Sequence, residues 1–90
     1  MLKGRVKIIN RLGLHARAAA QLVRLASGFQ SKIQIIRADH SVVADAKSIL
    51  SVLTLAAGMG VELELQIEGA DEEAAFQAVD EIFANGFGEL

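Results

Sequence analysis

The amino-acid sequence predicts an α+β fold in which an antiparallel sheet is covered by helices on one of its faces. Short segments alternate apolar and polar residues, which is typical of strands with one buried face. Between them lie segments whose apolar residues recur at helical spacing. The resulting order is βαββαβα. The chain has 90 residues, of which 52% are hydrophobic, so we expect residues 1–90 to form one domain with a modest aliphatic core.

The first half of the chain begins with a strand over residues 3–9, where three basic residues alternate with apolar ones or glycine. Residues 10–13 form a loop. From Ala16 to about Ser27 the apolar residues fall on one face of a helix, and Gly28 is a plausible stop. Alternation resumes over residues 32–37, which predicts a second strand.

The middle of the chain continues with a hairpin, in which residues 38–40 form the turn and residues 41–44 the returning strand. Ser48 then opens an apolar segment that extends to Ala57. We expect this segment to be a helix of two or three turns that Ser48 caps and that Gly58 or Gly60 ends.

The last third contains the clearest strand pattern, residues 61–68, where four apolar residues alternate with four polar ones. Its acidic face could pair with the basic face of the first strand. Asp71 is expected to cap the last helix, whose first turn holds two glutamates and which Gly86 ends.

Composition excludes several classes of protein. A net charge of −2 and the absence of Trp and Tyr make nucleic acid a poor partner, because binding it needs positive charge and stacking rings. Without cysteine the chain can form no disulfide or thiolate metal site, and a reducing cytoplasm is the natural compartment. The apolar runs are too short to span a membrane, so we expect no direct membrane insertion.

A candidate site lies at the junction between the first loop and the first helix. His15 stands there, directly before the alanine-rich helical segment, and Arg17 follows it. The first backbone N–H groups of a helix lack intrahelical partners, so those of Ala16 and Arg17 are expected to bind an anion such as phosphate. A neutral imidazole can act as a nucleophile, and a guanidinium can hold phosphate oxygens. Together these groups predict a phosphoryl acceptor.

Two motifs in the chain resemble those of a known family. Gly13-Leu14-His15-Ala16-Arg17 and Ala46-Lys47-Ser48-Ile49-Leu50 resemble the active-histidine and regulatory-serine motifs of HPr, the histidine-containing phosphocarrier family of the bacterial sugar phosphotransferase system. The resemblance covers essentially the whole chain. It implies an open-faced β-sandwich, with four antiparallel strands in order 1-4-2-3 and three helices on one face.

The same resemblance implies the function and the partners. His15 would accept a phosphoryl group from Enzyme I, which phosphoenolpyruvate charges, and would pass it to EIIA domains. The protein would be a monomeric carrier without a cofactor, rather than an enzyme in its own right. Ser48 would be phosphorylated where an HPr kinase/phosphorylase is present. A plain helix cap is the alternative role for Ser48.

The chain departs from the family pattern at two positions. Ala18 stands where the family usually has proline, and since alanine is the best helix former we expect the first turn to survive. Ala56 stands where a glycine is frequent near the end of the second helix, which is expected to lengthen that helix by a turn.

Residues expected to dock partners are the apolar side chains of the second helix. One helical face cannot bury every apolar residue between positions 49 and 55, so some must be exposed, and an exposed apolar cluster favours docking. The predicted docking residues are Ala20, Arg24, Ile49, Leu50 and Leu53. His40 lies in the hairpin turn without a cluster of further ligands, so no metal site is expected.

Other functions stay open at this point. The chain could be a paralogue that serves nitrogen regulation instead of sugar uptake. It could also be an acylphosphatase-type enzyme, although no suitable asparagine stands on a central strand, or a small-molecule-binding regulatory domain that never forms a phosphoenzyme.

Overall fold

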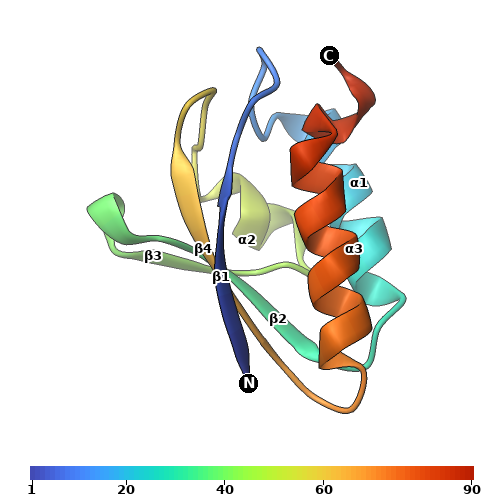
Figure 1. Ribbon diagram of the computed structural model, residues 1–90. Coiled ribbons are helices and arrows are strands. Elements are labelled where there is room, and N and C mark those ends of the chain that lie inside the picture. Colours follow the sequence, from blue (N-terminus) through green and yellow to red (C-terminus); the bar gives the residue numbers. More distant parts are fainter.

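The computed structural model describes residues 1–90 and contains one four-stranded sheet (Figure 1). The strands are β1 (Leu2–Lys7), β2 (Lys32–Arg37), β3 (Val42–Asp45) and β4 (Glu62–Glu68). They lie in the order β1-β4-β2-β3, and every neighbouring pair is antiparallel. The predicted strand order is therefore confirmed.

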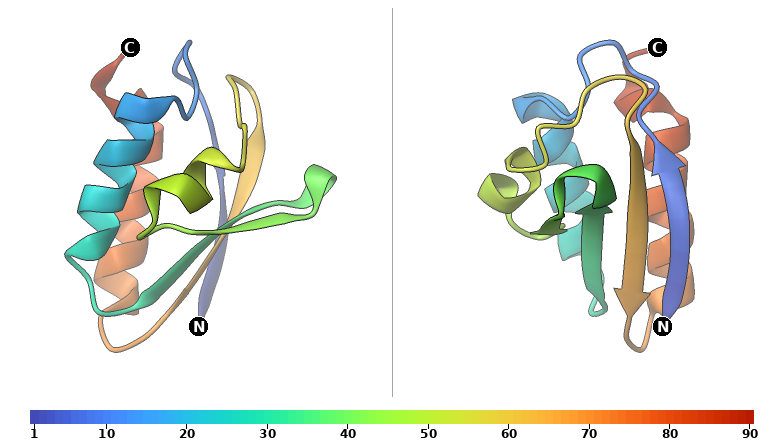
Figure 2. Two further views of the ribbon diagram at one scale, coloured as in Figure 1. Left: turned by 180° about the vertical axis from the view of Figure 1, so that it is seen from behind. Right: turned by 90° about the vertical axis from the view of Figure 1, so that its left-hand side faces the viewer.

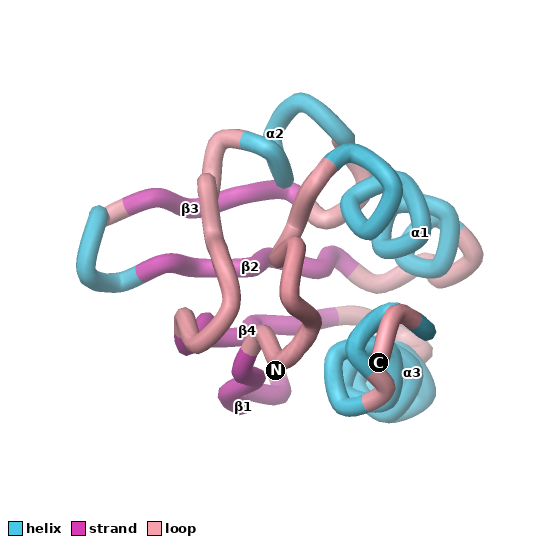
Figure 3. The backbone as a smooth tube through the Cα atoms, turned by 90° about the horizontal axis from the view of Figure 1, so that it is seen from above, coloured by secondary structure: helices cyan, strands magenta, loops and turns pink.

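Three α-helices cover one face of the sheet: α1 (Ala16–Ser27), α2 (Ile49–Leu53) and α3 (Glu72–Ala84). Figure 2 shows them on the same side from two further directions, and Figure 3 shows the layers from above. Two short 3-10 helices, η1 (Ala38–His40) and η2 (Gly86–Gly88), form the hairpin turn and the end of the chain. The α+β class, with helices on one face only, is confirmed.

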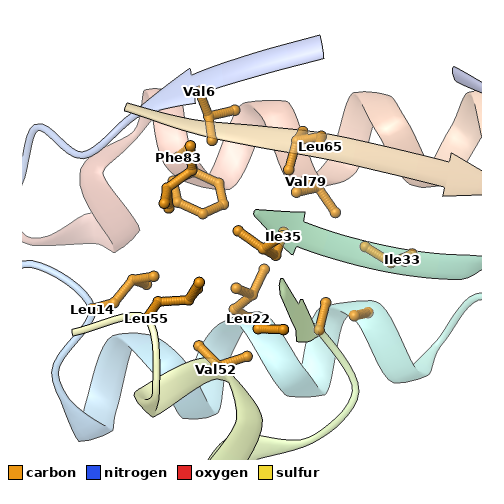
Figure 4. Close-up of a cluster of buried hydrophobic side chains, with 14 of the residues drawn as sticks. Val6, Leu14, Leu22, Ile33, Ile35, Val52, Leu55, Leu65, Val79 and Phe83 are labelled. Carbon is orange, nitrogen blue, oxygen red and sulfur yellow. The ribbon is translucent and has the colours of Figure 1, made fainter. Parts of the chain in front are cut away.

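The core lies between the sheet and the helices (Figure 4). Alternate strand residues point into it because side chains along a strand face opposite sides in turn. The strands contribute Ile33, Ile35, Leu63, Leu65 and Ile67, all at most 1% exposed. The helices place Leu22, Val52, Val79 and Phe83 against them. The outer face is polar, and there β1 and β4 set Arg5 opposite Glu64 and Lys7 opposite Glu62, as the alternation predicts.

The second helix is shorter than the sequence predicts. It ends at Leu53, after five residues, instead of continuing for two or three turns. Ala56 adopts a left-handed backbone conformation with φ of 47°, which is incompatible with continuing the helix toward Gly58. The Arg37 guanidinium donates hydrogen bonds to the carbonyl groups of Leu55 and Ala56, at 3.1 and 2.9 Å. This arginine therefore holds the turn that ends α2.

The prediction that the Asp71 side chain caps α3 is also wrong. Asp71 occupies the N-cap position of α3, but its carboxylate makes no hydrogen bond to that helix. Instead it accepts bonds from the backbone N–H groups of Gln30 and Ser31, both at 2.9 Å, and from the Ser31 hydroxyl. The hydroxyl of Ser31 and the amide of Gln30 lower the pKa of Asp71. Asp71 thus joins the α1–β2 and β4–α3 loops, a long-range contact that local sequence does not encode.

Candidate functional site

The loop between β1 and α1 is fixed by its contact with the loop that follows α2. Gly13 has a φ of 65°, and a Cβ atom there would lie 2.6 Å from the Ala57 carbonyl oxygen. The Leu14 amide donates to that same oxygen at 2.9 Å. Only glycine allows both the left-handed turn and this close approach. The contact sets the position from which α1 begins.

His15 is the N-cap residue of α1. Its backbone is extended, with φ of −73° and ψ of 179°, and its carbonyl accepts the first helical hydrogen bond, from Ala19 at 2.8 Å. The ring Nδ1 accepts a hydrogen bond from the backbone N–H of Arg17 at 3.3 Å. The side chain is 29% exposed. The ring is thus held by the helix end while one side remains open to solvent.

Arg17 and Ala16 form the first turn of α1 beside this ring, and both residues are exposed. The Arg17 guanidinium makes no hydrogen bond or ion pair within the chain, so its donors are free to meet an anion. No acidic side chain lies in the first turn, and the amides at a helix N-terminus carry partial positive charge. The structure therefore joins the His15 ring to the Arg17 backbone amide and leaves the Arg17 side chain exposed in the same helical turn.

The structure adds two residues that the sequence analysis missed, Glu89 and Asn10. The Glu89 Oε2 atom lies 2.7 Å from His15 Nε2, and its Oε1 accepts a hydrogen bond from Asn10 Nδ2 at 3.0 Å. Figure 1 shows the C-terminal segment at the same end of the molecule as the start of α1. Hydrogen bonds from Asn10 and His15, together with the positive charge of Arg17, lower the pKa of Glu89. Glu89 therefore stays ionised beside His15.

Ser48 lies at the N-cap of α2, as predicted. Its hydroxyl oxygen accepts a hydrogen bond from the backbone N–H of Ser51 at 3.3 Å, and the residue is only partly buried. The next residues expose their side chains: Ile49 by 39%, Leu50 by 75% and Leu53 by 37%. We call these three residues the α2 patch. The prediction that some apolar residues between positions 49 and 55 are exposed is therefore confirmed.

The helix that carries the α2 patch packs against α1. On α1, Arg17, Ala20 and Arg24 are spaced three and four residues apart and so share one helix face. Ala20 is partly buried and Arg24 is exposed. Two loop residues that the sequence analysis did not single out, Leu12 and Met59, are also strongly exposed, by 67% and 62%. Their exposure could not be recognised from spacing, since both lie outside regular elements.

The surroundings of His15 are a surface and not a pocket. A hollow of about 520 Å³ opens on the outer face of the sheet, lined by Arg5, Asp39, Glu62 and Glu64 among others, and His15 is not part of it. No three His, Cys, Asp or Glu side chains come together in a way that could hold a metal ion. No helix is long and apolar enough to cross a membrane.

Comparison with known proteins identifies the family. A family model described as the PTS HPr component phosphorylation site matches residues 2–85. The phosphocarrier protein HPr of Treponema pallidum is 49% identical over 84 residues, which is 93% of each chain. That of Cupriavidus necator is 47% identical over 89 residues, covering 99% of this chain and 98% of the relative.

A solved structure agrees with these matches. The crystal structure of HPr from Thermoanaerobacter tengcongensis superposes with a TM-score of 0.93 at 37% identity, covering all of this chain and 99% of the other. Sequence and architecture therefore point to the same relatives over nearly the full length. The chain belongs to the HPr family, the phosphocarrier proteins of the bacterial phosphotransferase system.

Proposed function

We propose that His15 is the phosphoryl acceptor of this carrier, that Enzyme I is its donor and that EIIA domains are its acceptors. The observation that carries the proposal is the hydrogen-bonding pattern of the imidazole. An ionised carboxylate only accepts hydrogen bonds, so the contact between Glu89 and Nε2 assigns the ring proton to Nε2. Nδ1 accepts a bond from the Arg17 amide at 3.3 Å, so it carries no proton. That bond breaks as Nδ1 attacks, which releases the Arg17 amide for a phosphoryl oxygen.

The transfer step follows from this arrangement. The Nδ1 lone pair attacks the phosphorus of the charged donor, a bond from Nδ1 to phosphorus forms, and the bond to the donor's leaving atom breaks with its electron pair. The amides of Ala16 and Arg17 and the Arg17 guanidinium meet the phosphoryl oxygens. Such reactions depend mainly on positioning and on compensating the charge of the phosphoryl group. An open surface site suits a carrier, because each partner must supply the rest of the reaction site.

Incubation of the purified chain with phosphoenolpyruvate and Enzyme I tests this function. Mass measurement should show one added phosphate that is lost in acid, as expected for phosphate bound to an imidazole nitrogen. An unmodified mass would reject the carrier reaction. Hydrolysis of an acyl phosphate by the chain alone would favour the acylphosphatase alternative instead.

The α2 patch is proposed to dock both donor and acceptor. Replacing Leu50 with aspartate should weaken binding of Enzyme I and of EIIA together, by roughly tenfold to a hundredfold in Kd, because an exposed leucine anchor is lost and a charge must be desolvated. Calorimetric titration with each partner measures this. Val43→Asp is a matched control, since Val43 is 56% exposed but lies next to buried Ala44 on β3 and so faces the outer side of the sheet.

The two partners must use the patch in turn, so we expect their binding to be mutually exclusive. Loss of affinity for one partner with the other unchanged would show that the patch is not shared. An equal effect of Val43→Asp would show that added negative charge alone weakens binding.

Ser48 is proposed as a regulatory phosphorylation site. Phosphate adds about two negative charges beside the α2 patch, where a partner has to strip water from them on binding, which is costly. The Ser48→Asp variant should therefore slow phosphoryl transfer through His15. Because aspartate caps a helix about as well as serine, the melting temperature should be unchanged.

The transfer rate and a thermal melt of the same variant measure the two effects separately. Ser41→Asp is the control, because Ser41 is exposed in the hairpin turn and its φ of 53° is one that aspartate tolerates. A normal transfer rate in Ser48→Asp, or a slow rate explained by unfolding, would leave Ser48 as a helix cap only.

A further inference from the structure

The carboxylate of Glu89 bridges two side chains that lie far from it in the sequence. One oxygen is 2.7 Å from His15 Nε2 and the other is 3.0 Å from Asn10 Nδ2. The Glu89 side chain is only 15% exposed. The family model matches residues 2–85, so Asn10 and His15 lie inside the matched region and Glu89 lies outside it.

The end of the chain is anchored so that Glu89 is held in place. Phe87 is 3% exposed and meets the ring of Phe83 edge to face, with ring centroids 5.0 Å apart and planes at 72°. Three successive residues, Gly86, Phe87 and Gly88, adopt positive φ values of 56°, 56° and 73°. The Glu89 amide donates to the Gly86 carbonyl at 3.0 Å. The buried Phe87 ring and the hydrogen-bonded turn therefore hold this segment, and with it Glu89, in a defined position.

Asn10 holds the other side of the carboxylate. Its side chain is fully buried, and Nδ2 donates to the Gly13 carbonyl at 2.9 Å as well as to Glu89. Both of its amide protons are thus committed to acceptors, and flipping the amide would set its oxygen against two other oxygens. The amide oxygen Oδ1 is buried with no partner. The two bonds from Nδ2 therefore hold the amide in one orientation, with its NH₂ group toward Glu89.

We propose that Glu89 and Asn10 are positioning residues for His15: Asn10 aims the Glu89 carboxylate at Nε2–H, and the carboxylate keeps the ring proton on Nε2, so that Nδ1 stays unprotonated beside the Arg17 amide. The inference rests on the proposed function of His15. It parallels the role of the carboxylate that holds the histidine of a serine protease in one tautomer and stabilises its cation.

The carboxylate acts in both directions of transfer. When Nδ1 bonds to phosphorus, the Nε2 proton stays in place and the ring becomes cationic, and the negative charge of Glu89 compensates it. In the return step the bond between phosphorus and Nδ1 breaks and its electron pair goes back to Nδ1. Because Nε2 has kept its proton, the departing group is a neutral imidazole and not an imidazolate. No further reactant is needed.

Nitrogen NMR of the unphosphorylated protein tests the positioning directly. With ¹⁵N-labelled histidine at alkaline pH, where imidazoles are uncharged, the two ring-nitrogen shifts of His15 report the tautomer ratio. The wild-type ring should carry its proton almost entirely on Nε2. Glu89→Ala should move the ratio toward the Nδ1–H form by roughly tenfold to a hundredfold, the worth of a hydrogen bond to a charged group.

Matched variants separate positioning from charge and from folding. Glu73→Gln removes one exposed charge from the opposite end of α3 and should leave the ratio unchanged. Asn10→Ala should shift it in the same direction as Glu89→Ala, but less. Because Asn10 is buried and its loss also loosens the loop, the decision rests on the partly exposed Glu89. An unchanged ratio in Glu89→Ala, or an equal change in Glu73→Gln, would overturn the proposal.

Kinetics of transfer from Enzyme I supply the second readout. Glu89→Ala should lower kcat by about tenfold or more with KM nearly unchanged, because the group acts on the reacting ring and not on docking. Glu89→Asp should recover part of the loss. A change in KM alone would assign Glu89 to partner binding and overturn the positioning role. Since the tautomer ratio is measured without any donor, failure of phosphoryl transfer in the wild type would count against the proposed function and not against this contact.

Discussion

Replacement of His15 with alanine is expected to abolish phosphoryl acceptance from Enzyme I while leaving the fold intact. The proposed reaction needs a nucleophile at the N-terminus of α1, and the His15 side chain stands there with an unprotonated Nδ1. None of the neighbouring loop and first-turn residues, from Arg11 to Ala18, carries another nucleophile of this kind. The measurement is the phosphate content after incubation with phosphoenolpyruvate and Enzyme I.

The second histidine provides the matched control. His40 is exposed in the hairpin turn, 3.5 Å from Asp39, and His40→Ala should be phosphorylated as fast as the wild type. Circular dichroism and a thermal melt should find His15→Ala folded, with at most the loss of about 0.5–2 kcal/mol that a missing helix cap costs. Phosphate retained by a folded His15→Ala protein would end the proposal that His15 is the acceptor.

Arg17→Ala should slow the transfer by about 10²–10³-fold, the typical effect of removing one preorganised donor to a developing charge. The Arg17 amide contacts the His15 ring and the guanidinium has no hydrogen-bond or ion-pair partner in the chain, so we propose that the guanidinium meets the phosphoryl oxygens. Arg17 is exposed and alanine favours helices, so stability should change by no more than about 0.5 kcal/mol. Rapid-quench measurements of phosphoryl transfer from Enzyme I give the rate, and a thermal melt of the variant gives its stability.

Two further variants sharpen this measurement. Arg17→Lys keeps the charge but loses the forked geometry, and should recover part of the rate. Arg5→Ala removes an exposed charge from the outer face of β1, opposite Glu64, and should transfer normally. An unchanged rate in Arg17→Ala would return Arg17 to an ordinary surface role.

The spacing of apolar residues predicted most of the helices and strands, because each element buries one face and that face can be recognised from neighbouring residues. The strands over residues 32–37 and 61–68 and the helix over residues 16–27 lie where their alternation or helical spacing indicates. The resemblance to the HPr family supplied the strand order, which no local pattern contains. The helix after Ser48 was predicted too long because propensity favours continuation through Ala56, whereas the carbonyl groups of Leu55 and Ala56 are held by Arg37 at the end of β2.

In the candidate site, too, the residues that are neighbours in the sequence could be predicted, and those that only the fold brings together could not. His15 and Arg17 could be predicted because they are neighbours within one motif, and their geometry follows from the start of a helix. Glu89 could not, because it is separated from His15 by 74 positions and reaches the ring only through the buried Phe87 and its left-handed turn. Asn10 left a partial signal, since Asn near Gly13 is typical of a turn. Its second hydrogen bond, to Glu89, is visible only in the folded protein.

The measurement that tests the central claim most directly identifies the ring nitrogen that carries the phosphate. The protein is labelled with ¹⁵N-histidine, phosphorylated with phosphoenolpyruvate and Enzyme I, and examined for coupling between nitrogen and phosphorus. Coupling at Nδ1 of His15, with Nε2 still bearing its proton, is the predicted result. Coupling at Nε2 of His15, which Glu89 occupies in the structure, or at either nitrogen of His40, would contradict it.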